Sequence, residues 1–208
     1  MKVLLAIAIS YLIGSIPTAY IFGKWYKGID IRQHGSGNAG ATNVFRVLGK
    51  WPGIIVLTLD ILKGIVAVVV IGDLFGLTQV WPIILLGVAG VAGHNWTVFL
   101  NFKGGKGIAT SLGVLIGLTI KIAAIRPVLF MTVVIWAVCF IVSGFVSLAS
   151  IVAATILPIL MVATNQSFEI VALGVVFCIF VVLRHRPNIK RLLSGEESRF
   201  NLFSPKKK

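Results

Sequence analysis

Seven long apolar runs alternate with shorter polar segments along the 208 residues of the chain. A run of about 20 apolar residues is long enough for an α-helix to cross the hydrocarbon core of a bilayer. The pattern therefore predicts an all-α, polytopic membrane protein with seven transmembrane helices. The predicted spans are Val3–Gly23, Gly53–Gly72, Val80–Val98, Ile108–Ala124, Pro127–Phe145, Val146–Ala163 and Phe168–Leu183.

Several predicted boundaries depend on short signals. A proline after Arg126 opens the fifth span, and Ser143-Gly144 is the short polar break between the fifth and the sixth. The seventh span is short, but the charges and the proline of Arg184–Pro187 mark its exit from lipid. Met1–Gly23 is long enough to cross the bilayer and has no clear small-residue cleavage site, so it is interpreted as a span and not as a signal peptide.

The composition supports a membrane location. Hydrophobic residues make up 58% of the chain and the mean hydropathy is +1.02, both far above what is typical of a soluble domain. A net charge of +13 would suggest nucleic acid in a soluble protein, but the basic residues lie mainly in the gaps between the spans. Orientation in the membrane explains that distribution first, so no nucleic-acid partner is expected.

The basic residues are divided unequally between the two sides of the predicted bundle. With seven spans, Lys24–Pro52, the loop 94–107 and the tail from Arg184 share one side and hold 15 Lys and Arg residues, against three on the other side. The positive-inside rule places the basic side in the cytoplasm, the N-terminus outside and the C-terminus inside. The chain is thus predicted to be one transmembrane domain over residues 1–208, with cytoplasmic segments 24–52, 94–107 and 184–208.

A pair of opposite charges lies inside the second span. Asp60 and Lys63 are three residues apart, so they share one helix face and can partly neutralise each other. A structural pair is the favoured interpretation, and a role lining the site is the alternative. Cys139 and Cys178 form neither a metal-binding nor a disulfide pattern and are predicted to pack inside spans. The tail Lys206–Lys208 is expected to be solvated or to contact lipid headgroups.

The loop between the third and fourth spans has the composition of a phosphate site. Its glycines, at positions 104, 105 and 107, would let an anion approach backbone N–H groups, and a helix begins at Ile108. Lys103 and Lys106 add positive charge. The spacing is not that of a Walker loop, so nucleotide binding does not follow. A basic turn at the positive face of the membrane is the alternative interpretation.

Aromatic residues interleave with the polar groups of the same loop. Trp96, Phe99 and Phe102 are interpreted as interfacial anchors, because this is the usual role of aromatic side chains at a membrane surface. His94 lies at the interface end of the third span. A structural histidine and a substrate contact are both open for it.

The first cytoplasmic segment is small, polar and glycine-rich over residues 35–43 and then turns helical. Its glycines allow close backbone approach, its neutral polar groups can form hydrogen bonds, and Arg46 can bind phosphate with two donors. Ser36 and Arg46 are favoured as ligand contacts. Thr42 and Asn43 are equally well explained as residues that start a helix.

The third segment begins where the last span leaves the membrane. His185 and Asn188 are three residues apart, a placement suited to orienting a hydroxyl group. Glu196 is expected to pair with one of the surrounding cations. The basic residues of this segment are interpreted mainly as positive-inside charge, with one phosphate contact as the exception: Arg184, Arg186, Lys190 and Arg191.

Taken together, the three segments resemble the cytoplasmic motifs of the bacterial membrane acyl-phosphate:glycerol-3-phosphate acyltransferases. The resemblance spans nearly the whole chain, and three long motifs in order are far more specific than any one of them. The motifs read Gly35-Ser36-Gly37-Asn38-x-Gly40-Ala41-Thr42-Asn43-Val44-x-Arg46, then Gly93-His94-x-x-x-x-Phe99-x-x-Phe102-Lys103-Gly104-Gly105-Lys106-Gly107-x-Ala109-Thr110, then Arg184-His185-x-x-Asn188-Ile189-x-Arg191-Leu192-x-x-Gly195 with Glu197 or Glu196 after it.

Two places depart from the family pattern. Thr97 stands where the family often has proline, and Ser143-Gly144-Phe145 stands where an arginine-tyrosine pair is common. The role of that turn, which is followed by Ser147, is therefore open in this chain.

The resemblance implies an enzyme of phospholipid biosynthesis in lipid metabolism. It would transfer a fatty acyl group from acyl phosphate to the 1-hydroxyl of glycerol 3-phosphate, giving lysophosphatidic acid and phosphate, with neither acyl-CoA nor a metal or other cofactor. The expected partners are acyl phosphate, glycerol 3-phosphate and membrane lipid. The expected place is the bacterial cytoplasmic (inner) membrane, with the active site on the cytoplasmic face.

The resemblance also implies roles for individual residues. The implied catalytic residues are Ser36, Arg46, Lys106, His185 and Asn188. The implied substrate-binding residues are Gly37, Asn38, Thr42, Asn43, His94, Lys103, Gly104, Gly105, Gly107 and Ser147. Lys106 and the loop glycines would hold the donor phosphate, and His185 and Asn188 would orient the attacking hydroxyl.

The chemistry expected is direct transfer, because no serine-histidine-acid arrangement stands out and acyl phosphate is already activated. Whether His185 or the phosphate of the donor takes the proton stays open. A transporter or channel for an anionic metabolite is the competing class, although transporters usually show repeated halves and interrupted helices at the bilayer midplane. A membrane scaffold is a third class, but it would not need the glycine-lysine loop or Ser36.

Overall fold

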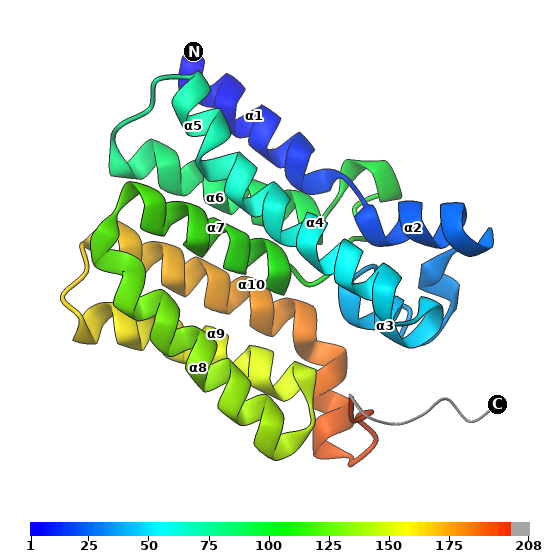
Figure 1. Ribbon diagram of the computed structural model, residues 1–208. Coiled ribbons are helices and arrows are strands. Elements are labelled where there is room, and N and C mark those ends of the chain that lie inside the picture. Colours follow the sequence, from blue (N-terminus) through cyan, green and yellow to red (C-terminus); the bar gives the residue numbers. More distant parts are fainter. Residues whose placement is uncertain (201–208) are drawn as a thin grey trace.

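The computed structural model describes residues 1–200, and these form helices and loops without a strand (Figure 1). The predicted tail Lys206–Lys208 lies outside the described residues. The α-helices are α1 (Lys2–Ser15), α2 (Thr18–Lys27), α3 (Ala41–Leu48), α4 (Lys50–Val68), α5 (Val70–Leu74), α6 (Val80–Asn95), α7 (Ile108–Lys121), α8 (Arg126–Ser143), α9 (Val146–Ala163) and α10 (Phe168–Leu193). Short 3-10 helices cover Ile31–Gln33, Val98–Leu100 and Ala123–Ile125.

Every predicted span contains helix, and six helical segments of the described chain are long and apolar enough to cross a membrane. These are Lys2–Lys27, Lys50–Leu74, Val80–Leu100, Ala123–Ser143, Val146–Ala163 and Phe168–Leu193. The remaining apolar helix, α7, has 14 residues. At 1.5 Å per residue it is about 21 Å long, which is shorter than the hydrocarbon core. The all-α prediction is confirmed, while the count of seven spans stays a prediction.

The first predicted span is broken in the middle. Helix α1 ends at Ser15 and α2 begins at Thr18, so the predicted span Val3–Gly23 is made of two helices, which together form one segment long and apolar enough to cross a membrane. The cause is Pro17, which disfavours the helical conformation in the residue before it; Ile16 accordingly has an extended ψ of 114°. As Figure 1 shows, α2 leaves the direction of α1 and runs beside α3.

The last helix is longer than predicted. The charges after Leu183 indicated an exit from lipid, but α10 continues to Leu193 with Pro187 inside it. A proline removes one backbone hydrogen bond, and here the helix tolerates that loss. Because the helix continues, His185 and Asn188 lie three residues apart on the same helical face.

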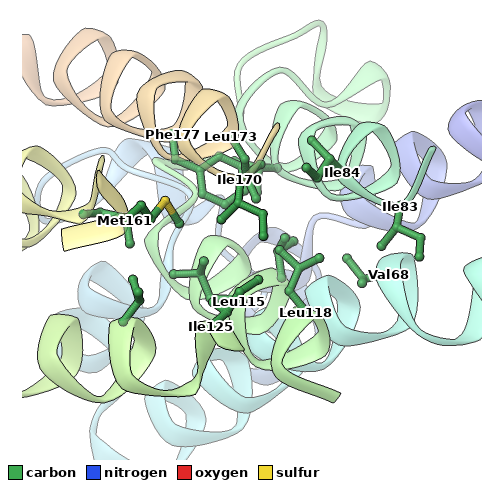
Figure 2. Close-up of a cluster of buried hydrophobic side chains, with 14 residues drawn as sticks. Val68, Ile83, Ile84, Leu115, Leu118, Ile125, Met161, Ile170, Leu173 and Phe177 are labelled. Atoms are coloured by element: carbon green, nitrogen blue, oxygen red, sulfur yellow. The ribbon is translucent and has the colours of Figure 1, made fainter. Parts of the chain in front are cut away.

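The helices pack through close backbone approach and one main apolar core. The helix pairs with the most extensive contact are α4 with α7, α1 with α6, and α9 with both α8 and α10. Glycine makes the contact of α4 with α7 possible, since a Cβ on Gly113 would overlap the Ile61 carbonyl. Figure 2 shows the core cluster, to which α7 contributes Leu115 and Leu118 and α10 contributes Phe177.

The polar elements gather at one end of the bundle. In Figure 1, α2, α3 and the C-terminal end of α10 lie away from the N-terminus, with α8 and α9 turning at the same end. Helix α8 forms an outer edge, since Val128 is its one buried residue. Its exposed apolar residues are those expected to face lipid.

Candidate active site

A cavity of about 510 Å³ lies among α3, α4, α7, α8, α9 and α10. The polarity of the residues that line the cavity changes along the helices. Along α7 the lining passes from Lys106 and Gly107 to Leu112 and Leu115. Along α10 it passes in the opposite chain direction, from Asn188 to Phe177. The cavity therefore has a polar end at the loops and an apolar end inside the bundle.

Most of the residues predicted for the site line this cavity. They are Ser36, Asn38, Thr42, Asn43, Arg46, His94, Lys106, Gly107, Ser147, His185 and Asn188. Four predicted residues do not: Gly37, Lys103, Gly104 and Gly105. Of these, Lys103 is exposed, and the two neighbouring glycines are buried in the loop behind the cavity.

Asn43 holds the first cytoplasmic segment in shape. Its Oδ1 accepts a hydrogen bond from the Ser36 N–H at 2.8 Å, and its Nδ2 donates to the carbonyls of His34 at 2.9 Å and Ile31 at 3.0 Å. The side chain is fully buried, and both of its polar atoms are already in use. Asn43 thus presents Ser36 to the cavity.

The N–H groups of Gly104 and Gly105 are not open to an anion, contrary to the prediction. They donate to the carbonyls of Asn95 at 3.2 Å and His94 at 3.0 Å. Glycine is needed here for close packing, since a Cβ on Gly105 would overlap the His94 ring. The side chain of Arg184 fastens the loop further by donating to the two glycine carbonyls at 2.8 and 2.9 Å. Arg184 was interpreted mainly as positive-inside charge. Its two hydrogen bonds show that it also has a structural role, so charge alone does not explain it.

The last part of the loop is the part whose geometry suits an anion. Gly107 adopts a left-handed conformation, with φ of 79°, and α7 begins directly after it. The first N–H groups of a helix have no partner within the helix and favour negative charge. Gly107, Ile108 and Ala109 all line the cavity beside Lys106. The start of α7 and Lys106 therefore have the free donors and the charge that suit a phosphate group.

A chain of hydrogen bonds joins the loop to α10 and to the segment after it. Lys106 Nζ donates to Asn188 Oδ1 at 2.5 Å, and Asn188 Nδ2 donates to Glu197 Oε1 at 2.7 Å. The same carboxylate accepts from Ser147 Oγ at 2.8 Å and from Arg191 Nε at 2.7 Å. The expected acidic partner was Glu196, but the structure uses its neighbour.

Burial and neighbouring charges shift the pKa values of two groups in this chain of hydrogen bonds, Lys106 and Glu197. Burial lowers the pKa of Lys106 to about 8, and nearby arginines, with Arg191 the largest contributor among them, act in the same direction against the opposing carboxylate of Glu197. For Glu197, burial would raise the pKa, but hydrogen bonds from Ser147, Asn188 and Arg191 outweigh burial and lower it. The pKa of the Lys106 ammonium therefore lies close to neutral pH, whereas the Glu197 carboxylate is ionised at that pH.

His185 is buried in the cavity wall with one ring nitrogen occupied. Its Nδ1 lies 2.9 Å from the carbonyl of Val181. Because a carbonyl only accepts, we assign the proton of the neutral ring to Nδ1. Its Nε2 is then the acceptor, which is the tautomer suited to taking a proton.

The predicted pair of Asp60 and Lys63 is confirmed, with Lys63 Nζ 2.9 Å from Asp60 Oδ1. Thr18 Oγ1 donates to the same oxygen at 2.7 Å, and His94 Nδ1 lies 3.6 Å from it. Lys63 also donates to the carbonyl of Ile16 at 3.2 Å, where the first span breaks. Its contacts agree with a structural role, and Asp60 also lines the cavity, so the alternative of a role lining the site stays open.

The aromatic residues of the loop have different places. The side chains of Phe99 and Phe102 are 59% and 58% exposed, which agrees with interfacial anchors. Trp96 packs edge-on against Phe180, with ring centroids 5.0 Å apart, and Arg184 lies over its ring. Trp96 is half-buried, so these tertiary contacts hold part of its ring, and its role as an interfacial anchor stays a prediction.

The segment after α10 closes one side of the cavity, a position that was not predicted for it from the sequence. Arg46 Nη2 donates to the Ser198 carbonyl at 3.2 Å, and the Phe200 N–H donates to the Gly144 carbonyl at 2.8 Å. Phe200 lines the cavity. Arg199 lies over the ring of Phe145, at the turn where the family often has its own arginine. The sequence signal that could have indicated this contact is one phenylalanine, Phe200, within a basic tail.

The apolar wall from α8 was also missed, although its spacing is helical. Leu129, Val133, Trp136 and Phe140 recur every three to four residues and line the cavity. The sequence pattern identified that face as apolar. It could not tell a face toward lipid from a face toward a cavity.

The sequence model of the family described as glycerol-3-phosphate acyltransferase matches residues 4–195. Three relatives bear that name. The protein of Synechococcus sp. (strain CC9902) is 47% identical over 94% of each chain. A second form from Moorella thermoacetica (strain ATCC 39073 / JCM 9320) is 45% identical over 93% of this chain and 95% of its own. The protein of Desulforudis audaxviator (strain MP104C) is 46% identical over 97% of each chain.

Two crystal structures of PlsY (YgiH), an integral membrane glycerol 3-phosphate acyltransferase, are similar to this fold. The glycerol 3-phosphate form has a TM-score of 0.87 and 37% identity, and the lysophosphatidic acid form has 0.84 and 36%. Each similarity covers 97% of this chain and 96% of the other.

Proposed function

This chain belongs to the glycerol-3-phosphate acyltransferase family, and we propose that it moves a fatty acyl group from acyl phosphate to the 1-hydroxyl of glycerol 3-phosphate. The products would be lysophosphatidic acid and inorganic phosphate, the first step of phospholipid synthesis. The relatives' names specify the acceptor and the acyl transfer. The acyl phosphate donor is the more specific part of the proposal.

The change of the cavity lining from polar at one end to apolar at the other is the observation on which the proposal rests. Acyl phosphate has an anionic head and a long apolar chain, and glycerol 3-phosphate adds a second anion. The cavity offers cationic and hydrogen-bonding groups at one end and a lining of leucine, valine and aromatic residues at the other. Such a cavity suits a reaction that joins a lipid chain to a small phosphate.

In the proposed arrangement, Lys106 and the first turn of α7 bind the donor phosphate. The acyl chain extends from there along Leu112 and Leu115 toward the apolar end. Ser36 and Arg46 bind the phosphate of glycerol 3-phosphate on the facing loop and helix. We leave Lys103 out of the site, because its side chain is exposed and outside the cavity lining.

The proposed reaction is a single transfer. The oxygen of the 1-hydroxyl attacks the acyl carbonyl carbon, the bond from that carbon to the phosphate oxygen breaks, and phosphate leaves with its electron pair. The proton of the hydroxyl goes either to His185 Nε2 or to the departing phosphate. Asn188 and His185 hold the hydroxyl in place, while Lys106 and Arg46 stabilise the negative charge that develops.

We further propose seven spans, with the N-terminus outside and the C-terminus inside the bacterial cytoplasmic (inner) membrane. The polar end of the cavity would then open to the cytoplasm. Support comes from the unequal division of Lys and Arg between the two sides. The end of the bundle with α2, α3 and the C-terminal end of α10 is also the end that holds the candidate catalytic groups.

The test is turnover by the purified, folded protein supplied with acyl phosphate and labelled glycerol 3-phosphate. We expect lysophosphatidic acid and inorganic phosphate in equal amounts, and no product when acyl-CoA replaces acyl phosphate. Product from acyl-CoA but not from acyl phosphate would overturn the donor assignment. Folded protein that makes no acylated lipid from either donor would overturn the acyltransferase proposal itself.

A further inference from the structure

Asp60 is an acidic side chain of the cavity wall that the proposed reaction does not use. It belongs to α4, where Leu57 and Ile61 line the cavity with it. Its side chain is only 1% exposed. A carboxylate buried this deeply in a membrane helix is costly unless it is paired.

The contacts of Asp60 all fall on one of its two oxygens. Within the described residues, the hydrogen bond from Thr18, the ion pair with Lys63 and the approach of His94 are all to Oδ1. Among residues 1–200, the structure records no hydrogen bond or ion pair for Oδ2. A carboxylate oxygen has lone pairs for about two hydrogen bonds, so Oδ2 has unused acceptor capacity.

The surroundings of the carboxylate indicate where Oδ2 lies. Thr18 and Lys63 border a second, much smaller cavity at the break between α1 and α2. Asp60 borders the large cavity and not the small one, while His94 borders both. The carboxylate thus stands between the two cavities, with Oδ1 toward the small one. We infer that Oδ2 lies on the side of the large cavity, where the 1% exposed fraction of the side chain leaves it in contact with the cavity edge.

The chemistry of an ionised carboxylate restricts what Oδ2 can bind. It only accepts hydrogen bonds, so its ligand must supply a donor, and it repels phosphate. Lys63 balances the charge of Asp60 through its contact with Oδ1. A neutral hydroxyl fits these requirements, and a hydroxyl bound to a carboxylate forms a charge-assisted hydrogen bond.

We propose that Asp60 is a substrate-binding residue whose Oδ2 accepts a hydrogen bond from the 2-hydroxyl of glycerol 3-phosphate. The inference rests on the proposed function, which supplies a phosphate-bearing acceptor with two hydroxyls. The 1-hydroxyl has to lie near His185 and Asn188 on α10, because it reacts. The 2-hydroxyl is the one left for α4, so Asp60 makes the enzyme select a glycerol backbone.

The test compares two acceptors that differ by one hydroxyl. Glycerol 3-phosphate carries both hydroxyls, and 3-hydroxypropyl phosphate lacks the 2-hydroxyl. For the wild-type protein we expect kcat/KM to be about tenfold to a hundredfold higher with glycerol 3-phosphate, the size of one hydrogen bond to a charged group. Wild-type protein that uses both acceptors equally well would overturn the role of Asp60 and leave the acyl transfer intact.

The variant Asp60→Asn keeps the shape of the side chain and removes its charge. We expect the preference for glycerol 3-phosphate to fall to within about threefold, mainly through a higher KM for that acceptor. The double variant D60N/K63M removes both charges, so no unpaired charge stays buried, and it serves if the single variant does not fold. A folded variant of either kind that keeps the full preference would overturn the inference.

Thr18→Val is the matched control. It removes a hydrogen bond from Oδ1 and leaves Oδ2 unchanged. We expect lower stability and an acceptor preference within about twofold of the wild type. Loss of the preference in Thr18→Val as large as in Asp60→Asn would mean that general damage to the cluster, and not Oδ2, changes the selectivity. Absence of acyl transfer to either acceptor in the wild type would instead overturn the proposed function.

Discussion

At the residue scale, Lys106 connects three parts of the site. It lies beside the N-terminus of α7, donates to Asn188 and lines the cavity. Its ammonium is surrounded by more cations than anions, since Arg46, Arg184 and Arg191 oppose the single carboxylate of Glu197. A second anion, such as a phosphate group, would relieve this imbalance.

The lowered pKa of Lys106 leads to a prediction about pH. The pKa is about 8, so the ammonium loses its proton and its charge as the pH rises through that value. We expect kcat/KM for acyl phosphate to fall on the alkaline side with a midpoint near pH 8. In Lys106→Arg the guanidinium stays protonated, so this fall should move to higher pH. Rates measured from about pH 6 to about pH 10 test both expectations.

Lys106→Ala separates a role in catalysis from a role in folding. We expect kcat/KM for the donor to fall by about a hundredfold or more, because a group that stabilises the transition-state charge is removed. The yield of folded protein should change much less. Lys103→Ala is the matched control, since that lysine is exposed, and it should keep most of the activity. Turnover that survives Lys106→Ala would contradict the phosphate assignment.

His185 has the geometry of a base, and substitution tests whether it acts as one. Its Nδ1 is occupied by the Val181 carbonyl, which leaves Nε2 as the acceptor. We expect His185→Gln, like His185→Ala, to lower kcat by about a hundredfold or more at saturating substrate. If His185→Gln retains most of kcat, the residue orients the hydroxyl, and the donor phosphate takes the proton.

At the element scale, the segment after α10 ties three elements together through one carboxylate. Glu197 accepts from Ser147 on α9 and from Asn188 and Arg191 on α10. We expect Glu197→Gln to lower both kcat and the melting temperature, the latter by about 5 °C, because the amide has one acceptor oxygen instead of two and no charge to pair with Arg191. Glu196→Gln is the matched control, since Glu196 is exposed, and it should behave like the wild type.

The same carboxylate makes stability depend on pH in a definite direction. The pKa of Glu197 is lowered in the folded state. Its contribution is therefore present above the ordinary glutamate pKa and is lost as the pH falls through the lowered folded value. The difference in melting temperature between the wild type and Glu197→Gln should shrink as the sample is acidified.

The glycine loop is an element whose shape depends on packing against α6. A Cβ on Gly105 would overlap the ring of His94, and the carbonyl of Ala39 lies close as well. We expect Gly105→Ala to destabilise the protein by about 1–3 kcal/mol, the usual cost of overpacking. Gly72→Ala is the control, because the nearest atom is 3.9 Å away, an ordinary contact. Equal stability of the two variants in a melting assay would contradict this view of the loop.

At the scale of the whole molecule, the proposed orientation can be tested at the two ends of α10. Ser167 precedes the helix and Ser194 follows it, and both are exposed. In a background with Cys139 and Cys178 replaced, we expect a membrane-impermeant maleimide to label Ser167→Cys on intact cells. Ser194→Cys should be labelled only after the membrane is opened. The reverse pattern would contradict a cytoplasmic site.

The family resemblance and the helical fold could be predicted from the sequence because they rest on local properties. An apolar run long enough to cross a bilayer has to form a helix, since its backbone groups have no other partner in lipid. The three polar segments were recognisable because each is contiguous, as with His185 and Asn188 on one turn. Pro17 was also visible in the sequence, but the break between α1 and α2 at this proline depends on the tertiary contacts around it.

The tertiary structure decided which atoms of those segments are available. The N–H groups of Gly104 and Gly105 are occupied by α6 carbonyls, so the proposed phosphate contacts are with Lys106 and the start of α7. The choice of Glu197 over its neighbour, and the turning of one Asp60 oxygen toward Thr18, depend on contacts between distant parts of the chain. A sequence states which groups exist, whereas packing determines which of their donors and acceptors are left for a substrate.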